Sequence, residues 1–336
     1  MPEDEGADWR PDTKLSGFEC LTLELPLATY APDEPETDPL VGTLVRRGPA
    51  RHPRAVLYVH GWSDYFFQTH LAKFFDQEGF DFYAVDLRRY GRSLGEGQFA
   101  GFITDLDEYG QELDAALEVV RADHDQMTVM GHSTGGLVAS LWASRRPGEL
   151  NGLILNAPWL DMHGTEAFRA VTSQFLKQMS KRNATYVINL PDSGLYVRSI
   201  HDSLDGEWDF DLGLKKHPSF VLRAGWLAAV MQGQKRVSAG LAIDCPVLTL
   251  ISDRSDFRRT WDESLFEADT VLEVDKLAKA AVRLGPHVTV VRIKGGMHDL
   301  TLSRLPARTA FFDEVRRWAH AYVVDRESLP EAVSAI

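Results

Sequence analysis

Short apolar runs alternate with amphipathic stretches along most of the chain, starting near residue 54. The runs have the length of buried strands, and the stretches between them have the hydrophobic spacing of helices. Strands are expected at 55–59, 82–85, 126–130, 152–155, 246–251 and 287–291, and helices at 66–78, 105–121, 135–145, 276–284 and about 306–323. Near-continuous apolar strands that alternate with helices are typical of a mostly parallel sheet flanked by helices. The pattern predicts an α/β fold.

Two stretches depart from this alternation. Residues 19–25 and 40–45 show shorter alternating runs around a loop rich in proline and acidic residues, which predicts an antiparallel edge to the sheet. From about 158 to 241 the alternation stops, and several helix-like pieces follow. We interpret this stretch as an insertion between two strands. The predicted domains are a core at 1–157 and 242–336, whose residues 1–15 form a flexible acidic tail, and a helical cap at 158–241.

Composition and charge narrow the class of protein. Of the 336 residues, 44% are hydrophobic and 25% are charged, with a net charge of -13, as in ordinary soluble proteins. The negative balance disfavours binding to nucleic acid or to anionic lipid. No apolar run has the length of a membrane span, and the acidic start lacks the features of a secretory signal. We therefore expect a cytoplasmic monomer or homodimer with no integral membrane segment.

Cysteine and histidine spacing gives no sign of a metal centre. Cys20 and Cys245 are the only cysteines, too few for a disulfide framework, and we expect both thiols to be buried. Neither His-x-x-x-His nor Cys-x-x-Cys occurs. We predict no metal and no cofactor. The basic pairs Arg88-Arg89 and Lys215-Lys216 are interpreted as solvated or salt-bridged surface.

The segment Gly131-His132-Ser133-Thr134-Gly135-Gly136 joins an expected strand to an expected helix. A Gly-x-Ser-x-Gly sequence at such a junction suits a sharp turn in which the serine has strained backbone angles. The flanking glycines are needed because neighbouring backbone comes too close for a β-carbon. This placement predicts that Ser133 is a nucleophile.

A nucleophilic serine needs a base, and the base needs an acid that orients it. His298 lies between the last predicted strand and the final helix, at the sheet edge where catalytic groups collect in open α/β folds. It is the predicted base. Asp269 is the predicted acid because strand-like and helix-like residues follow it, as in a strand-loop-helix unit. Asp253 and Asp256 remain alternative acids, although they could instead cap a helix at 257–267.

Two backbone N–H groups are predicted to bind the oxyanion. Thr134 lies at the positive end of the helix that follows Ser133. Trp62 lies in the loop after the first core strand, where the sequence reads His60-Gly61-Trp62. In the insertion, an apolar stripe could either cover the pocket or only pack onto the core. The residues expected to line the substrate site are His60, Gly61, His132 and Trp226.

Together these residues resemble the α/β-hydrolase superfamily, over nearly the whole chain beyond its first fifteen or so residues. The order Ser133, acid, His298 is that of the superfamily, and residues 86–93 look like its loop after the second core strand. Within this superfamily, the chain is most similar to the monoacylglycerol lipase, lysophospholipase and serine-aminopeptidase-like group. The similarity lies in the turn around Ser133, the His60-Gly61 pair and a cap between strands. Two features depart from the pattern: the long stretch between residue 251 and the acid, and the bulk of Trp62, which would narrow the acyl pocket.

Resemblance and chemistry together predict a cofactor-free serine hydrolase. It would cleave a small-molecule carboxylic ester, such as an acylglycerol, a lysophospholipid or another small acyl or aromatic ester, through an acyl-enzyme. An alternative is an aminopeptidase or amidase with the same triad, in which acidic residues of 202–211 bind an ammonium group. A further alternative is a non-catalytic binding protein that keeps the pocket.

Overall fold

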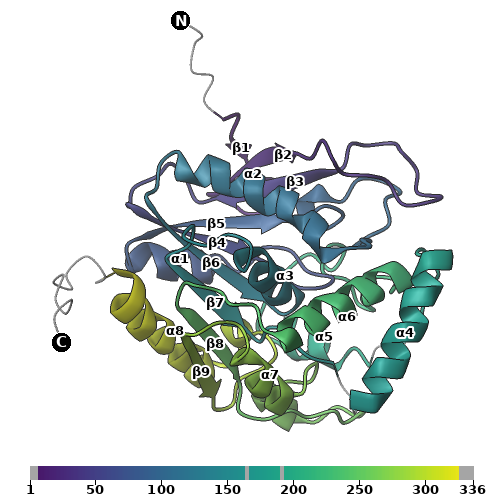
Figure 1. Ribbon diagram of the computed structural model, residues 1–336. Helices are drawn as coiled ribbons and strands as arrows, with labels where there is room; N and C mark the ends of the chain where they lie inside the picture. The colour runs from purple at the N-terminus through teal and green to yellow at the C-terminus, as the bar shows by residue number, and fades with distance from the viewer. Residues whose placement is uncertain (1–6, 163–165, 190–192, 325–336) are drawn as a thin grey trace, which may run out of the picture.

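The computed structural model describes residues 7–162, 166–189 and 193–324, and its centre is a nine-stranded sheet (Figure 1). The spatial order is β1-β2-β3-β5-β4-β6-β7-β8-β9. Strands β4 to β9 are parallel to their neighbours within this group, whereas β1, β2 and β3 pair antiparallel at one edge. The strands are β1 (Arg10–Pro11), β2 (Glu19–Glu24), β3 (Val41–Arg46), β4 (Arg54–Val59), β5 (Phe80–Asp86), β6 (Gln126–His132), β7 (Gly152–Asn156), β8 (Val247–Ser252) and β9 (Val288–Ile293). The predicted mostly parallel sheet with an antiparallel edge is confirmed.

Helices cover both faces of this sheet (Figure 1). Helices α1 and α8 pack on one face, and α2, α3 and α7 pack on the other. The helices are α1 (Thr69–Gln77), α2 (Gly110–Arg121), α3 (Thr134–Ala143), α4 (Glu166–Arg182), α5 (Leu195–Ile200), α6 (Ala224–Ala239), α7 (Val274–Ala281) and α8 (Leu305–Ala319). No helix among the described residues combines the length and the apolar character that a bilayer crossing needs.

Strand β4 shows why the central strands are apolar without interruption. Successive side chains of a strand point to opposite faces of its sheet. Leu57 and Val59 therefore enter the core under α2 and α3, whereas Val56 and Tyr58 enter the core under α1 and α8. Because both faces are buried, neither set can be polar.

Two predictions near polar segments are wrong. The helix considered at 257–267 does not form, and only a short 3₁₀ turn is present at Glu263–Glu267, where Asp262 accepts a hydrogen bond from the Ser264 amide. Residues 7–15 belong to the predicted flexible tail, but β1 pairs with β2, and Asp12 forms a 2.7 Å ion pair with Arg92. The rest of the predicted tail, residues 1–6, lies outside the described residues.

The basic pair Arg88-Arg89 is buried, which corrects its interpretation as surface. Arg88 has no exposed side-chain area and forms a 2.7 Å ion pair with Glu112, whose side chain is also fully buried. Arg89 pairs with Glu34 at 2.5 Å. Sequence pattern alone could not show this because each carboxylate partner comes from a distant segment. The two pairs attach the loop after β5 to α2 and to the segment before β3.

The insertion, defined here as residues 158–241, leaves the sheet after β7 and returns before β8, which is the neighbour of β7. Its helix α6 packs against α3 of the core, and α4 packs against the outer side of α6 (Figure 1). Gly233 allows the close approach, since a β-carbon there would stand 2.9 Å from Leu141 and 3.0 Å from Leu106. The insertion therefore lies beside the carboxyl edge of the parallel strands.

Candidate active site

Ser133 occupies a tight turn between β6 and α3, with φ 52° and ψ -118°. A β-carbon at Gly131 would lie 2.6 Å from the carbonyl oxygen of Gly135, and one at Gly135 would lie 2.2 Å from the carbonyl oxygen of His60. Only glycine fits at these two positions. The turn thus places the serine in a strained conformation at the carboxyl edge of the sheet, as the pattern predicts.

The structure brings Ser133, His298 and Asp269 together, although they are far apart in the chain. His298 Nε2 lies 3.0 Å from Ser133 Oγ, and His298 Nδ1 lies 3.0 Å from Asp269 Oδ2. The other carboxylate oxygen, Oδ1, accepts hydrogen bonds from the amides of Val271 and Leu272, at 2.8 and 2.7 Å. If Nδ1–H donates to Asp269, Nε2 carries the lone pair that can accept the serine proton.

The alternative acids are engaged elsewhere. Asp253 Oδ1 accepts a hydrogen bond from the Gly295 amide at 3.0 Å. Asp256 pairs with Arg258 at 2.7 Å, and the hydrogen bond from Arg258 lowers the pKa of Asp256. Of the three aspartates considered, Asp269 is the one whose carboxylate hydrogen-bonds to His298.

Asn156, at the end of β7, connects the serine turn to the histidine loop. Its carbonyl oxygen accepts hydrogen bonds from the Ser133 amide at 3.0 Å and from His132 Nδ1 at 3.2 Å. Its side chain donates to Asp299 Oδ1 at 2.7 Å and accepts from the Leu300 amide at 3.1 Å. Sequence reasoning missed both Asn156 and Asp299. The available signal was an amide at the carboxyl end of a buried strand.

The network behind the site holds a buried negative charge. Burial alone would raise the pKa of Asp299, but the nearby His132 ring and the hydrogen bonds from Thr301 and Asn156 lower it to about 2. Burial lowers the pKa of His132, whereas the Asp299 carboxylate acts in the opposite direction by attracting a positive charge on the ring. His132 packs 5.0 Å from the His298 ring, centroid to centroid, and its Nδ1 is held by Asn156. The ring therefore supports the turn and the histidine loop.

The two amides predicted to bind the oxyanion lie at the edges of the Ser133 turn. Thr134 is the first residue of α3, where amides have no acceptor within the helix. Trp62 follows Gly61, and a β-carbon on Gly61 would stand 3.1 Å from Ser133 Cβ, so this loop lies directly against the serine. Within the described part of the chain, neither amide donates to a protein acceptor. Both are therefore available to a ligand.

His60 is a structural contact, which differs from its predicted place in the substrate site. The Leu87 amide donates to its Nε2 at 3.1 Å, so Nδ1 donates to the Gly61 carbonyl at 2.8 Å. With both ring nitrogens engaged, the side chain has no polar group left for a substrate. Its role is to hold the loop that carries Gly61.

Trp226 is buried within an aromatic cluster shared by the core and the insertion. The Trp62 ring packs against Trp226 at 3.8 Å and against Phe220 at 5.8 Å, both between centroids. Trp226 also contacts Trp159, at 5.8 Å. The apolar stripe of the insertion thus packs onto the core through the loop next to Ser133.

One group of potential metal ligands occurs among the described residues, at His201, Asp202 and Asp209. The His201 ring is already engaged, since Nε2 bonds to the Phe210 carbonyl at 3.1 Å and Nδ1 accepts from the Ser203 amide at 3.0 Å. No free imidazole donor is left, and the group does not fit a metal centre.

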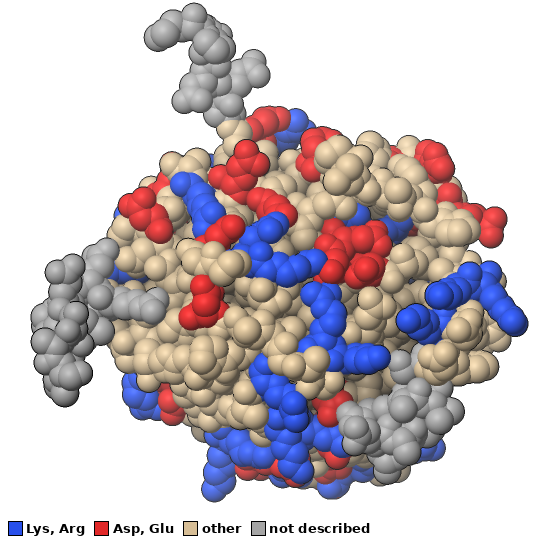
Figure 2. Space-filling model, viewed as in Figure 1, with Lys and Arg blue, Asp and Glu red and all other residues tan. Residues whose placement is uncertain are grey.

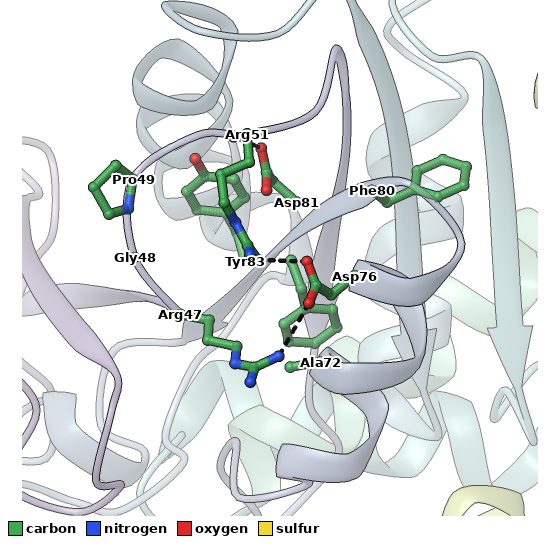
Figure 3. Close-up of a pocket in the computed structure, with 10 residues that line it drawn as sticks. Arg47, Gly48, Pro49, Arg51, Ala72, Asp76, Phe80, Asp81 and Tyr83 are labelled. Carbon is green, nitrogen blue, oxygen red and sulfur yellow. Dashed lines mark hydrogen bonds and ion pairs between the residues drawn. The ribbon is translucent and has the colours of Figure 1, made fainter.

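A small cavity lies at the opposite edge of the sheet, near the start of β5 (Figure 3). Arg47 and Arg51 converge there on Asp76, with 3.2 Å between Arg47 and Asp76 (Figure 3). Its volume of about 10 Å³ holds at most one water molecule. It is too small for a substrate.

Charge on the face shown in Figure 2 is mixed, with acidic and basic side chains side by side over much of it. Arg121 pairs with Glu149 at 3.0 Å, and Arg145 pairs with Asp107 at 2.6 Å. Ion pairs of this kind neutralise surface charge locally, which weakens any field that could attract a polyanion.

Comparison with known proteins agrees with the geometry. A family model described as serine aminopeptidase, S33, matches residues 50–303. A monoacylglycerol lipase of Mycolicibacterium smegmatis is 24% identical over 274 residues, covering 80% of this chain and 89% of that protein. The fold is similar to the crystal structure of Paleococcus ferrophilus monoacylglycerol lipase, with a TM-score of 0.59, 19% identity and coverage of 81% of this chain and 96% of that one.

A soluble variant of monoglyceride lipase from Saccharomyces cerevisiae, solved with a substrate analogue, is also similar. Its TM-score is 0.61 at 15% identity, with 89% of this chain and 97% of that chain covered. These matches confirm the α/β-hydrolase fold and the resemblance drawn from the sequence motifs. With the family model spanning most of the sheet and the serine turn, this chain belongs to the serine aminopeptidase, S33, family of α/β serine hydrolases.

Proposed function

We propose that this protein hydrolyses carboxylic esters of small molecules through an acyl-enzyme on Ser133. The hydrogen-bonded chain from Ser133 Oγ through His298 to Asp269 carries this proposal. Such a chain lets a neutral imidazole take the serine proton while the carboxylate stabilises the imidazolium that forms. The comparisons support the proposal, because the relative and both structural neighbours bear the names of monoacylglycerol or monoglyceride lipases.

The reaction follows from the positions of these groups. As Ser133 Oγ attacks the carbonyl carbon, its proton passes to His298 Nε2, and the carbonyl oxygen becomes an oxyanion facing the Thr134 and Trp62 amides. The carbon–oxygen ester bond then breaks, and His298 returns the proton to the leaving alcohol. A water molecule repeats the sequence on the acyl-enzyme, which releases the acid and restores Ser133.

The surroundings of the serine turn are apolar. Phe220 and Trp226 are buried and pack with Trp62 in an aromatic cluster next to the loop that lies against Ser133. Apolar surroundings of this kind suit an aliphatic or aromatic acyl chain better than a polar one. We propose acylglycerols, lysophospholipids and similar small esters as the substrate class.

The test replaces Ser133 by alanine and measures turnover of a short p-nitrophenyl ester. We expect turnover to fall by about 10⁴-fold or more, and a fluorophosphonate probe to label the wild type but not Ser133→Ala. Ser238→Ala serves as a matched control because Ser238 is an exposed serine on α6. Undiminished turnover in Ser133→Ala would sink the proposal.

An aminopeptidase with the same triad is the second candidate, favoured by the description of the matching family. The acidic residues that could bind a substrate ammonium group are largely engaged with bases: Asp205 with Arg198, Glu207 with Arg304, and Asp211 with Lys14. We therefore rank it below the esterase. Turnover of aminoacyl amides well above that of acyl esters would reverse the order.

A further inference from the structure

Three consecutive residues after Gly61 contact the insertion. Trp62 packs against Phe220, Ser63 Oγ accepts a 3.2 Å hydrogen bond from the Phe220 amide, and Asp64 Oδ1 lies 2.7 Å from Lys215 Nζ. Ser63 has φ 49°, in the left-handed region that non-glycine residues rarely adopt. Each of these three residues in the loop after β4 therefore contacts the insertion, and these contacts help to fix the conformation of the loop.

The Lys215–Asp64 ion pair is almost completely buried. The two side chains retain 4% and 1% of their exposure, so Lys215 is not the surface residue that the sequence suggests. Asp64 Oδ2 also lies 3.5 Å from the Gly61 amide, across the turn that carries Trp62. A buried ion pair fixes its partners in space, because separating them leaves an uncompensated charge.

Lys215 also approaches the base. Its Nζ lies 5.5 Å from the centre of the Tyr196 ring, and that ring packs edge-on against His298 at 5.4 Å between centroids. The ammonium group thus lies between the loop of Trp62 and the aromatic ring that backs the catalytic histidine. Lys215 therefore contacts both the loop that carries Trp62 and the ring that packs against His298.

We propose that Lys215 is a positioning residue that holds the loop of Asp64 so that the Trp62 amide faces the oxyanion. This inference rests on the proposed function. An oxyanion donor acts only when it is placed within a few tenths of an ångström of the developing charge. The insertion, in this arrangement, helps to complete the oxyanion hole.

The deciding variant is the double substitution Lys215→Met with Asp64→Leu, which removes both charges and leaves neither buried alone. Its kcat for a p-nitrophenyl ester should fall by at least about tenfold while KM changes less than about threefold. The inhibition constant of a trifluoromethyl ketone, whose adduct places an oxyanion in the same hole, should rise by a similar factor. Active-site titration with a fluorophosphonate corrects every rate for misfolded protein.

Lys216→Met is the matched control, since Lys216 is the exposed neighbour of Lys215 and should behave as wild type. If the double variant is insoluble, Ser63→Gly decides, because it removes the acceptor for the Phe220 amide and tolerates the positive φ. It should lower kcat about threefold or more at similar KM. Wild-type kcat and ketone affinity in the soluble variant would overturn the inference, as would a kcat loss without a loss of ketone affinity. Both results would leave the proposed role of Ser133 unaffected, because Ser133→Ala tests that role separately.

Discussion

The two halves of the site are held by different parts of the chain. Ser133, His298 and Asp269 are fixed mainly by the core, through Asn156, Asp299 and the amides after Asp269, although Tyr196 of the insertion also packs against His298. The loop of Trp62 is fixed largely by the insertion, through Lys215 and Phe220. In the proposed reaction, proton transfer would depend mainly on residues of the core, whereas stabilisation of the oxyanion would also depend on the position of the insertion. Substitutions in the two halves should separate these functions.

The largest effect is expected from Asp269→Asn on the core side. The amide would keep its bonds to Val271 and Leu272 through oxygen but turn an N–H toward His298 Nδ1, which favours the wrong tautomer. We expect kcat to fall by about 10³ to 10⁴-fold with the fold retained. Steady-state kinetics and circular dichroism test this. Asp253→Asn and Asp256→Asn are controls, and an equal loss in either would contradict the assignment of the acid.

Gly135→Ala should strongly destabilise the core, which holds the serine turn. The added β-carbon would lie 2.2 Å from the His60 carbonyl oxygen and 2.4 Å from that of Val59, so α3 must move away from β4. We expect a loss of about 3 kcal/mol or more in the free energy of unfolding, measured with urea. Near wild-type stability would show that the turn is looser than the geometry implies.

Gly61→Ala tests the loop that carries Trp62, where we expect activity to change more than stability. Its β-carbon would meet Ser133 Cβ at 3.1 Å and His132 Cδ2 at 3.2 Å, a contact that a small shift of the loop relieves. We expect stability to change by less than about 1 kcal/mol and kcat to fall about tenfold, because the shift moves the Trp62 amide. Kinetics and unfolding on the same sample measure both. A loss of stability without loss of kcat would reverse the interpretation.

The smallest effect concerns the pH dependence of the core network. The pKa of Asp299, about 2, lies below its usual value of 3.8, so the carboxylate stabilises the fold above about pH 4, and this stabilisation is lost as pH falls toward 2. Between pH 7 and pH 3, wild type should lose about 1 kcal/mol more unfolding free energy than Asp299→Asn. Urea unfolding at the two pH values tests this. Equal losses of unfolding free energy in the two proteins would show that Asp299 does not cause this pH dependence.

The core half could be predicted from the sequence because its signals are local. Gly131 and Gly135 bracket Ser133 in a steric pattern, and His298 follows a strand, so topology alone brings them to one edge. Asp269 was harder, since two other aspartates follow the same strand and only the fold shows which one reaches His298. The sequence also predicted the Trp62 amide as an oxyanion donor, but the contacts that hold its loop were missed because they join residues up to 151 positions apart, as between Lys215 and Asp64. A lysine in a polar stretch gives no local sign of burial.

The insertion starts and ends at adjacent strands, β7 and β8, so its two attachment points are close together. Such a segment can be exchanged between related enzymes, or lengthened, without rethreading the sheet. In this protein, a replacement segment would have to supply a cation that pairs with Asp64. A transplanted segment that brings no cation to Asp64 would leave a buried carboxylate unpaired, so the loop and the segment should be replaced together.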